Sequence, residues 1–408
     1  MKKRVARLGL ALLTVVVQAA LLLAGCRYDD TAVQSTFPEA RNPTPVFTNG
    51  SDGYACYRIP AIIRTPNGSL LAFAEGRTNG CSDFGNVDIV LRTSNNNGVS
   101  WSPLKIVADF DTLQAGNPSP VVDRLDANFP EGRIFLAFNT GIASEQETRK
   151  GNGLREVWYT TSNNNGLTWS DPTNITTSVH RPLRPDIDPA YNFADDWRSY
   201  AIAPGHAIQL TNDRYAGRLL FPANHSEGDP LDRFDEYRSH VFFSDDHGRT
   251  WQLGGSVDVP SANEAIAAEL DDGRVMLNIR EQSGRERKRL VATSSDGGAT
   301  WENIHFDDAL PGPVCQASIL NVTLGDGRSA LLFSNPASTE RRERMTIRTS
   351  FDSGETWPIA HEIDAGPSAY SDLVGLADGQ IGLLYERGND GGIVFWSSPV
   401  DSVANGMK

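Results

Sequence analysis

The 408-residue sequence is poor in lysine and carries a large excess of acidic residues. Its 37 Lys and Arg residues are outnumbered by 51 Asp and Glu residues, so the formal net charge at pH 7 is −14. A chain with this charge repels the phosphates of nucleic acids and anionic membrane surfaces, so neither is expected as a partner. A small anionic ligand would need a local cluster of arginines that acts against the overall field.

An apolar run from Leu8 to Leu23 follows a basic start and is short for a membrane span. This arrangement is typical of an export signal. It ends in Leu-Ala-Gly-Cys at Cys26, which resembles the bacterial lipobox, whose Cys is lipidated and becomes the mature N-terminus. We expect a signal peptide over 1–25, a tether over 26–44, and an exported protein anchored through Cys26 to a bacterial membrane, periplasmic or at the cell surface. A transmembrane anchor and a soluble secreted form are the alternatives.

Cysteine is scarce, with four residues and no CxxC pair. Beyond Cys26 only Cys56, Cys81 and Cys315 remain, and their spacing offers no metal site. Export permits a disulfide, and Cys56 with Cys81 is the pair to test, because both flank stretches that carry chemistry below. Cys315 is expected to be a small buried residue.

Five copies of one eight-residue pattern organise the rest of the chain. Each reads Ser-x-Asp/Asn-x-Gly-x-Thr/Ser-Trp, and the copies begin at Ser94, Ser162, Ser244, Ser294 and Ser350. In such a turn the Asp or Asn bonds nearby backbone amides, the Gly accepts a positive φ, and the Trp can bury. The pattern therefore predicts five hairpin turns.

The spacing of the five copies is near the length of a four-stranded propeller blade with variable loops, and too irregular for a tight solenoid. Strand-like residues lead directly into four of the copies, at 87–93, 156–161, 240–243 and 346–349. About 360 residues remain after the N-terminal segments, a length that suits six blades. We expect an all-β fold, a six-bladed β-propeller, formed by one domain over 45–400.

The first stretch with chemistry is Tyr57-Arg58-Ile59-Pro60. An Arg between an aromatic residue and Ile-Pro at a strand start is unusual in a core and acceptable at the rim of a site. With this motif and the five turns, the chain resembles the bacterial and animal exo-sialidases, whose hallmarks are an Arg-Ile-Pro near the N-terminus and several Asp boxes of this kind. The resemblance covers nearly all of Thr44 to Pro399.

In that family three arginines from separate blades clamp the carboxylate of sialic acid. By the resemblance, Arg58 is the first, Arg280 the second and Arg342 the third. Arg341 and Arg344 stand beside Arg342, so a slip of register is open. Guanidinium groups suit this task because they bind a carboxylate through two hydrogen bonds and stay charged at any useful pH. Taken singly, each Arg could equally be a solvated surface residue.

The resemblance also implies an acid/base Asp in a loop, and the match places this role on Asp83 rather than on Asp88, which lies on a strand. A group that protonates a glycosidic oxygen and then activates water needs mobility and a matched pKa, which suits a loop carboxylate. Capping of a turn is the alternative role for Asp83. By the same resemblance, Arg77 and Glu75 lie near the glycerol or C4 side of the sugar.

The family uses a Tyr nucleophile, and here the match falls on Tyr370. Sialic acid carries a carboxylate on its anomeric carbon, which repels an Asp or Glu nucleophile but not a neutral phenol. A phenol, with a pKa of about 10, needs a base beside it, and the match gives that role to Glu264. Glu386 matches the family Glu that orients Arg58. Without the resemblance, Tyr370 would be a buried aromatic and Glu264 a solvated acid.

The resemblance thus implies an exo-α-sialidase that removes terminal α-linked sialic acid from glycoproteins, glycolipids and oligosaccharides with net retention. It implies a monomer that requires no metal and no organic cofactor. Two alternatives stay open: a trans-sialidase or anhydro-forming enzyme, and a sialic-acid-binding propeller without turnover. The presence of Asp83, Glu264 and Tyr370 together favours turnover.

Overall fold

The computed structural model describes residues 41–212, 214–388 and 392–406, all of which belong to one compact unit. The predicted signal peptide over 1–25, the predicted lipidation site Cys26 and most of the predicted tether lie outside these residues, so the division of the chain at 25 and 44 stays a prediction. Among the residues that the structure describes, no helix has the length and apolarity needed to cross a membrane.

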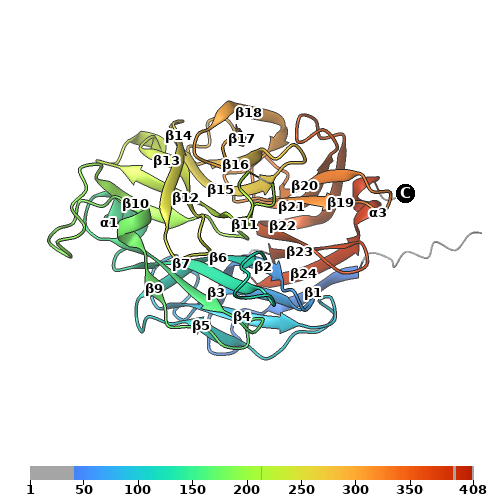
Figure 1. The fold of residues 1–408 in the computed structure, drawn as a ribbon, viewed down its shortest axis with the longest axis horizontal. Helices are drawn as coiled ribbons and strands as arrows, with labels where there is room; N and C mark the ends of the chain where they lie inside the picture. Colours follow the sequence, from blue (N-terminus) through green and yellow to red (C-terminus); the bar gives the residue numbers. More distant parts are fainter. Residues whose placement is uncertain (1–40, 213, 389–391, 407–408) are drawn as a thin grey trace, which may run out of the picture. The chain divides into compact units, whose positions relative to one another are not determined.

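The fold is all-β, as the sequence predicts, with sheets arranged around a common centre in the manner of a propeller (Figure 1). The largest sheet has eight strands: β2 (Cys56–Arg64), β3 (Leu70–Arg77), β4 (Val87–Ser94), β5 (Lys105–Ala108), β6 (Gln114–Asp123), β7 (Arg133–Gly141), β8 (Arg155–Ser162) and β9 (Thr173–Asn174). Five strands form the next sheet: β10 (Trp197–Ile202), β11 (Ile208–Gln209), β12 (Leu219–Glu227), β13 (Tyr237–Ser244) and β14 (Gln252–Val257).

Two further sheets complete the described strands. One has four: β15 (Ala262–Glu269), β16 (Val275–Glu281), β17 (Lys288–Ser294) and β18 (Glu302–Pro311). The other has seven: β1 (Arg41–Phe47), β19 (Ser318–Thr323), β20 (Ser329–Pro336), β21 (Glu343–Ser350), β22 (Ile359–Gly375), β23 (Gln380–Arg387) and β24 (Ile393–Pro399). The helices are short: α1 (Glu145–Arg149), α2 (Thr176–Val179), the 3₁₀ helix η1 (Asp232–Phe234) and α3 (Val400–Ala404).

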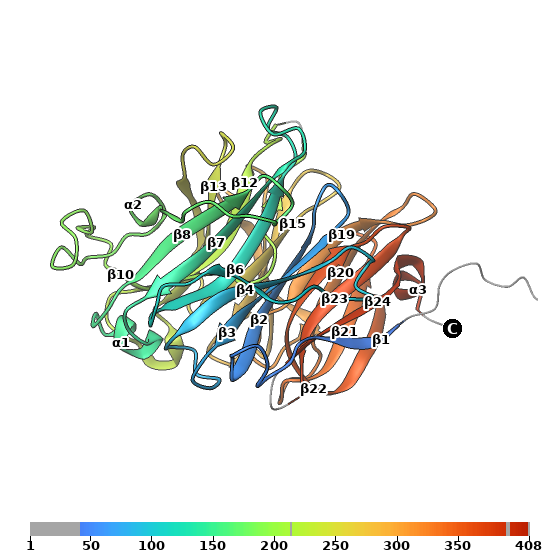
Figure 2. The same ribbon diagram turned by 90° about the horizontal axis from the view of Figure 1, so that it is seen from below.

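The first and last strands pair with each other. β1 runs antiparallel to β24, with Thr44 opposite Phe395 and Phe47 opposite Ile393, and Figure 2 shows this blue strand beside the red strands of its sheet. Four residues at the end of the predicted tether, 41–44, lie within β1. The first described strand is therefore the edge strand of a sheet whose other strands all come from the C-terminal part of the chain.

The core lies between neighbouring sheets. β3 is buried along its whole length, and its apolar side chains point alternately to the two faces. In one cluster Phe135 of β7 packs with Phe221 of β12 and Phe242 of β13, so it joins two sheets. Strands that are covered on both faces carry nearly continuous apolar runs, which accounts for the composition before each repeated turn.

The five repeated turns share one hydrogen-bond pattern, as predicted. In each, the Ser Oγ accepts the Gly N–H at 2.8–2.9 Å. The Asn or Asp Oδ1 accepts the N–H two residues after that Gly at 2.8–3.0 Å. The expected burial of the tryptophans holds only for Trp251, whereas the other four are half-buried. These four rings, Trp101, Trp169, Trp301 and Trp357, pack against the apolar core clusters as partly buried residues.

The glycine of each turn is needed for close packing as well as for its backbone conformation. Gly98 has φ +79°, and a Cβ built there would lie 2.1 Å from the Phe395 ring. At Gly248 the same construction meets the Phe135 ring at 2.3 Å. In both cases the neighbour belongs to a different set of strands, so these turns fasten adjacent sets together. Trp101 adds an edge-on contact with Phe395 at 5.5 Å between ring centres.

A comparison of Gly98 with Gly50 separates the cost of the backbone conformation from the cost of the lost close packing. We expect Gly98→Ala to lower the free energy of unfolding by about 2–5 kcal/mol, because it combines left-handed backbone strain with a clash. Gly50 has nearly the same φ, +77°, with nothing within 4 Å of a built Cβ. Gly50→Ala should therefore cost only about 1–2 kcal/mol. Denaturant unfolding of both variants measures the difference, and equal losses would show that the contact with Phe395 is unimportant.

Candidate active site

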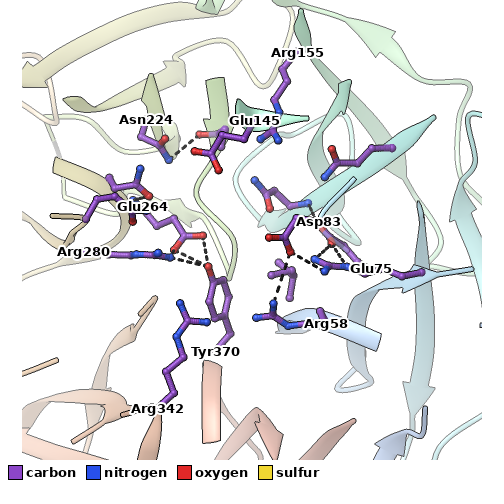
Figure 3. Close-up of a pocket in the computed structure, with 17 residues that line it drawn as sticks. Arg58, Glu75, Asp83, Glu145, Arg155, Asn224, Glu264, Arg280, Arg342 and Tyr370 are labelled. Atoms are coloured by element: carbon purple, nitrogen blue, oxygen red, sulfur yellow. Dashed lines mark hydrogen bonds and ion pairs between the residues drawn. The ribbon is translucent and has the colours of Figure 1, made fainter. Parts of the chain in front are cut away.

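The structure brings eight of the predicted site residues into one pocket, although they span most of the domain (Figure 3). These are Arg58, Glu75, Arg77, Asp83, Glu264, Arg280, Arg342 and Tyr370. They come from β2, β3, β15, β16, β22 and two loops. Of the remaining predicted residues, Glu386 lies behind Arg58 on β23, and Cys26 is outside the described residues.

Irregularities in the strands aim several of these side chains. A strand normally alternates its side chains between two faces, and a bulge interrupts this alternation and redirects a residue. β2 shifts register between Arg58 and Ala61, where Ile59 has φ +60°. In β15 the register shift lies between Ala262 and Ala265 and so includes Glu264. In β22 it lies between Ser368 and Ser371 and so includes Tyr370. Three separate bulges thus direct an arginine, an acid and a phenol toward one space.

Three guanidinium groups gather on one side of the pocket, and neighbouring acids hold two of them. Arg58 donates from Nε and Nη2 to the two oxygens of Glu386, each at 3.0 Å. Arg280 donates from Nη1 to Glu264 Oε2 at 2.5 Å. Burial alone would lower the pKa of Arg58 and Arg280, but the acidic groups beside them raise both pKa values above the ordinary value. Both arginines therefore stay charged.

Arg342 is the third member of the cluster, and the alternatives beside it lie elsewhere. Its Nη2 donates to the carbonyl of Val314 at 2.9 Å. Arg341 is 75% exposed and Arg344 57% exposed, and each pairs with a surface glutamate. Of these three arginines, Arg342 is the one that lines the pocket. Among the residues that the structure describes, no carboxylate forms an ion pair with it, so its charge faces the pocket.

Tyr370 and Glu264 form a close pair inside this cluster. The Tyr370 hydroxyl donates to Glu264, with Oη 2.7 and 2.9 Å from the two carboxylate oxygens. Arg280 Nη1 donates to the same phenol oxygen at 2.9 Å. Burial, and then the charge of Glu264, raise the pKa of Tyr370 well above its ordinary value. Tyr370 is therefore a neutral phenol whose proton already points at a base.

Asp83 lies across the pocket from Glu264, at the end of a chain of charged groups (Figure 3). Arg77 is buried and donates to Glu75 from Nε and Nη2, and to Asp83 Oδ1 from Nη1 at 2.7 Å. Asp83 itself is 77% exposed. Burial would raise its pKa, but Arg77 and then Arg58 lower it below the ordinary value. Asp88, the alternative on the strand, is buried against Tyr54 and does not line the pocket.

Sequence reasoning missed several polar residues that line the same pocket: Gln114, Asn117, Glu145, Arg155, Asn224 and Gln282. One signal was present, because Gly-Asn-Pro at 116–118 marks an irregular strand, and β6 does shift register there. Arg155 is 7% exposed and forms no ion pair with the residues described in the structure. It gave no signal, since it lies next to ordinary strand residues.

The cysteines behave as the sequence suggests. Cys56 and Cys81 form a disulfide, which joins the start of β2 to the loop of Asp83. Cys315 is a free buried thiol that packs with Ile59 and Tyr370 behind the pocket. Burial raises the pKa of the Cys315 thiol, so it stays protonated.

One group of metal-ligand side chains occurs among the described residues, and it lies away from the pocket. Ligand atoms of Asp123, Asp126 and His247 fall within 4.8 Å of one another. Their atoms already have protein partners, since His247 Nδ1 lies 2.9 Å from Asp123 Oδ2 and Asp126 Oδ1 accepts two hydrogen bonds from Asn128. The pocket residues are an arginine cluster with acids behind it, a set suited to an organic anion rather than to a cation.

Comparisons with known proteins identify a family and several relatives to which this chain is similar. The family model of the BNR repeat-like domain matches residues 68–383. A sialidase from Micromonospora viridifaciens is 36% identical over 350 residues, which cover 83% of this chain and 51% of that protein. A sialidase from Bacteroides fragilis (strain YCH46) is 30% identical over 359 residues, which cover 83% and 61% of the two proteins.

The chain is also similar to a solved structure of a sialidase. The structure described as Hadza microbial sialidase Hz136 superimposes with a TM-score of 0.76 and 28% identity, and the match covers 89% of this chain and 69% of that one. The likeness supports the propeller type of the fold. The chain spans about half the length of the Micromonospora protein and about three-fifths of the Bacteroides protein.

Removing the charge behind Arg58 tests whether Glu386 holds the site together. We expect Glu386→Gln to lower the free energy of unfolding by about 3 kcal/mol, because a largely buried arginine loses its anionic partner. The matched control is Glu343→Gln, which removes the partner of the exposed Arg341 and should cost less than about 1 kcal/mol. Urea unfolding compares the two, and a small loss in both variants would contradict the supporting role of Glu386.

Proposed function

This chain belongs to the BNR repeat-like domain family, and we propose that it is an exo-α-sialidase that hydrolyses terminal α-linked sialic acid from glycoproteins, glycolipids and oligosaccharides. The observation that carries the proposal is the phenol of Tyr370, hydrogen-bonded to Glu264 within a cluster of three arginines. This arrangement combines a nucleophile, its base and an anion site in one pocket. The sialidase relatives of known sequence support the same activity.

The proposed domain is a propeller of six blades. The eight-stranded sheet is joined between β4 and β6 by a single parallel pair, Val87 with Gln114. Likewise β22 pairs with β21 up to Pro367 and with β23 from Ser368 onward. If the two large sheets are divided at these places, β22 contributes one strand position to each side of its division. β10 and β11 count as one position because both pair with β12. The strands then form six groups of four positions. The inner strands also contact one another in a closed order, β2, β6, β11, β15, β19, β22 and back to β2.

Binding begins with the substrate carboxylate. Arg58, Arg280 and Arg342 would hold it by charge-assisted hydrogen bonds, and this fixes the anomeric carbon above Tyr370. Arg58 and Arg342 lie over the Tyr370 ring at 5.3 and 5.6 Å, which keeps the ring in place. A substrate with a carboxylate at this carbon is therefore oriented before any bond changes.

In the first chemical step, Tyr370 Oη forms a bond to the anomeric carbon while its proton passes to Glu264. The bond from that carbon to the glycosidic oxygen breaks, and the leaving oxygen takes a proton from Asp83. Arg280 stabilises the phenol oxygen as its proton departs. Because the phenol is neutral before attack, it approaches the anionic sugar without repulsion.

Asp83 must gain a proton before it acts as an acid, since its pKa is lowered in the unliganded site. The substrate supplies two causes that raise this pKa. Its carboxylate offsets the charge of Arg58, and its glycan covers the exposed carboxyl group. In the second step the ionised Asp83 takes a proton from water, the water oxygen attacks the anomeric carbon, and Tyr370 leaves with its proton restored from Glu264. Two displacements give net retention.

A pair of tyrosine variants tests this mechanism. We expect Tyr370→Phe to lower kcat for release of a fluorescent phenol from its α-sialoside by on the order of 10³-fold or more, since the nucleophile is lost. Tyr385→Phe is the matched control, because it also removes a buried hydroxyl, one that lies 3.2 Å from Asp364, and should keep activity. Proton NMR of the first product distinguishes the α anomer of sialic acid from an anhydro or transferred sugar. Full activity of folded Tyr370→Phe would exclude the mechanism.

We also propose that the enzyme works as an exported monomer anchored through lipidated Cys26. The basic start, the apolar run and Leu-Ala-Gly-Cys in the sequence support this location. Cys26→Ser should move the protein from the membrane fraction to the soluble fraction of its bacterial host, as measured by immunoblot. Equal recovery of both proteins in the membrane fraction would contradict the lipid anchor.

A further inference from the structure

We propose that the Cys56–Cys81 disulfide is a positioning element for Asp83, so that full activity requires this pair to be oxidised. The inference rests on the acid/base role proposed for Asp83. It assigns the disulfide no contact with the sugar, because its effect is exerted through the loop that carries the carboxyl group.

The disulfide connects two parts of the site that belong to different elements. Cys56 is the first residue of β2, stands two positions before Arg58 and is fully buried. Cys81 stands two positions before Asp83 in the loop 78–86 and is exposed. The two Cα atoms lie 5.2 Å apart. The bond therefore fixes the tip of this loop to the strand that holds one arm of the arginine cluster.

The loop has few other attachments. Its two ends are joined by a backbone hydrogen bond of 3.2 Å, and Ser82 bonds only within the loop. Within the described parts of the chain, the hydrogen bonds and ion pairs that join 81–83 to other residues come from Arg77 and Arg58. The glycines at the sides of the loop have positive φ, so its backbone has little intrinsic preference for one conformation.

The electrostatic attachments of Asp83 weaken during the proposed reaction. Asp83 is 77% exposed, and an ion pair with an exposed partner stabilises a conformation only weakly. When Asp83 carries the proton that it delivers to the glycosidic oxygen, it is neutral, and its attraction to Arg77 and Arg58 weakens. The attachments of the loop tip that do not depend on the charge of Asp83 are then the disulfide, which is covalent, and the hydrogen bond from Arg77 to the Cys81 carbonyl. The disulfide limits the positions available to Asp83 when the arginines hold its carboxyl group less strongly.

Reduction would release the loop without dismantling the anion site. Arg58 keeps its two hydrogen bonds to Glu386, and β2 keeps its pairing with β3. Dithiothreitol supplies two electrons and two protons to the disulfide, which becomes two thiols, while the reagent is oxidised to its cyclic disulfide. Since Cys81 is exposed, a small dithiol can reach the bond. Binding of the sugar carboxylate should survive, and proton delivery should fail.

This distinction sets the experiment, because only a poor leaving group needs the acid. The substrates are sialyllactose, whose leaving group is a sugar alkoxide, and an α-sialoside of a fluorescent phenol. The wild type and Cys56→Ser/Cys81→Ser are assayed with and without dithiothreitol. We expect the double variant and the reduced wild type to lose about 10²-fold in kcat/KM on sialyllactose and less than about 3-fold on the phenyl sialoside. Dithiothreitol should leave kcat/KM of the double variant unchanged. This control excludes an effect of the reagent on Cys315.

A double-mutant cycle tests whether the effect of the disulfide on activity is exerted through Asp83. Asp83→Asn alone should show the same dependence on the leaving group. Combined with the two Cys substitutions, it should lose no further activity on sialyllactose, because the disulfide would then have nothing left to position. The affinity for free sialic acid, measured by calorimetry, should change less than about 3-fold in the double Cys variant, since the arginines are retained.

Three outcomes overturn the inference: an equal loss on both substrates, no loss on either, or a loss that adds to that of Asp83→Asn. Reduction of the folded wild type keeps the test decisive if the double variant does not fold. A wild type that releases sialic acid from neither substrate overturns the proposed function and this inference with it.

Discussion

Three guanidinium groups share one pocket only because acids stand behind them. Like charges in a half-buried space repel strongly, and each unpaired charge also loses its hydration. Glu386 compensates Arg58 through two hydrogen bonds, and Glu264 compensates Arg280. Among the described residues, Arg342 contacts the carbonyl of Val314 and the face of the Tyr370 ring, and no carboxylate pairs with it. The cluster of three arginines and two acids therefore keeps one uncompensated positive charge inside a chain of net charge −14, and an incoming carboxylate can balance it.

This charge balance connects binding to the chemistry. Glu264 is the partner of Arg280 and also the acceptor of the Tyr370 proton. In the proposed mechanism Glu264 takes that proton, so Arg280 loses its anionic neighbour at the same moment as the phenol oxygen becomes electron-rich. Arg280 can then stabilise that oxygen, to which it is already hydrogen-bonded. Proton transfer and nucleophile activation are thus supported by one group of three side chains.

The repeated turns and the bulges contribute to the site at different distances. The turns fasten neighbouring sets of strands through a glycine packed on an apolar side chain, which is Phe395 at Gly98 and Leu71 at Gly166. The bulges lie near the pocket ends of the strands and aim single residues. A rigid frame makes such aiming useful, because a misplacement of about 1 Å at the reacting groups can cost about 10²-fold in rate.

The sequence predicts much of this arrangement where the signal is local. The turn pattern, the strands before it and the all-β class follow from short motifs, whereas the membership of Tyr370 and Glu264 in one pocket is implied only by the family resemblance. Other features depend on packing between distant segments. Arg155 enters the pocket only because of how β7 and β8 are placed. Four of the five turn tryptophans are only half-buried, which the repeated pattern does not predict, and Arg342 is distinguished from its neighbours only by the course of its loop.

The pairing of β1 with β24 has a consequence for the order of synthesis. A ribosome makes β1 first and its partner nearly last, so at about 5–20 residues per second the strand waits for tens of seconds without its native neighbour. An unpaired strand edge invites wrong pairing. β1 contains Pro43 and Pro45, which cannot donate backbone hydrogen bonds and so make it a poor template for other strands. The first strand of the described fold is thus a poor partner for other strand edges during the time before β24 is made.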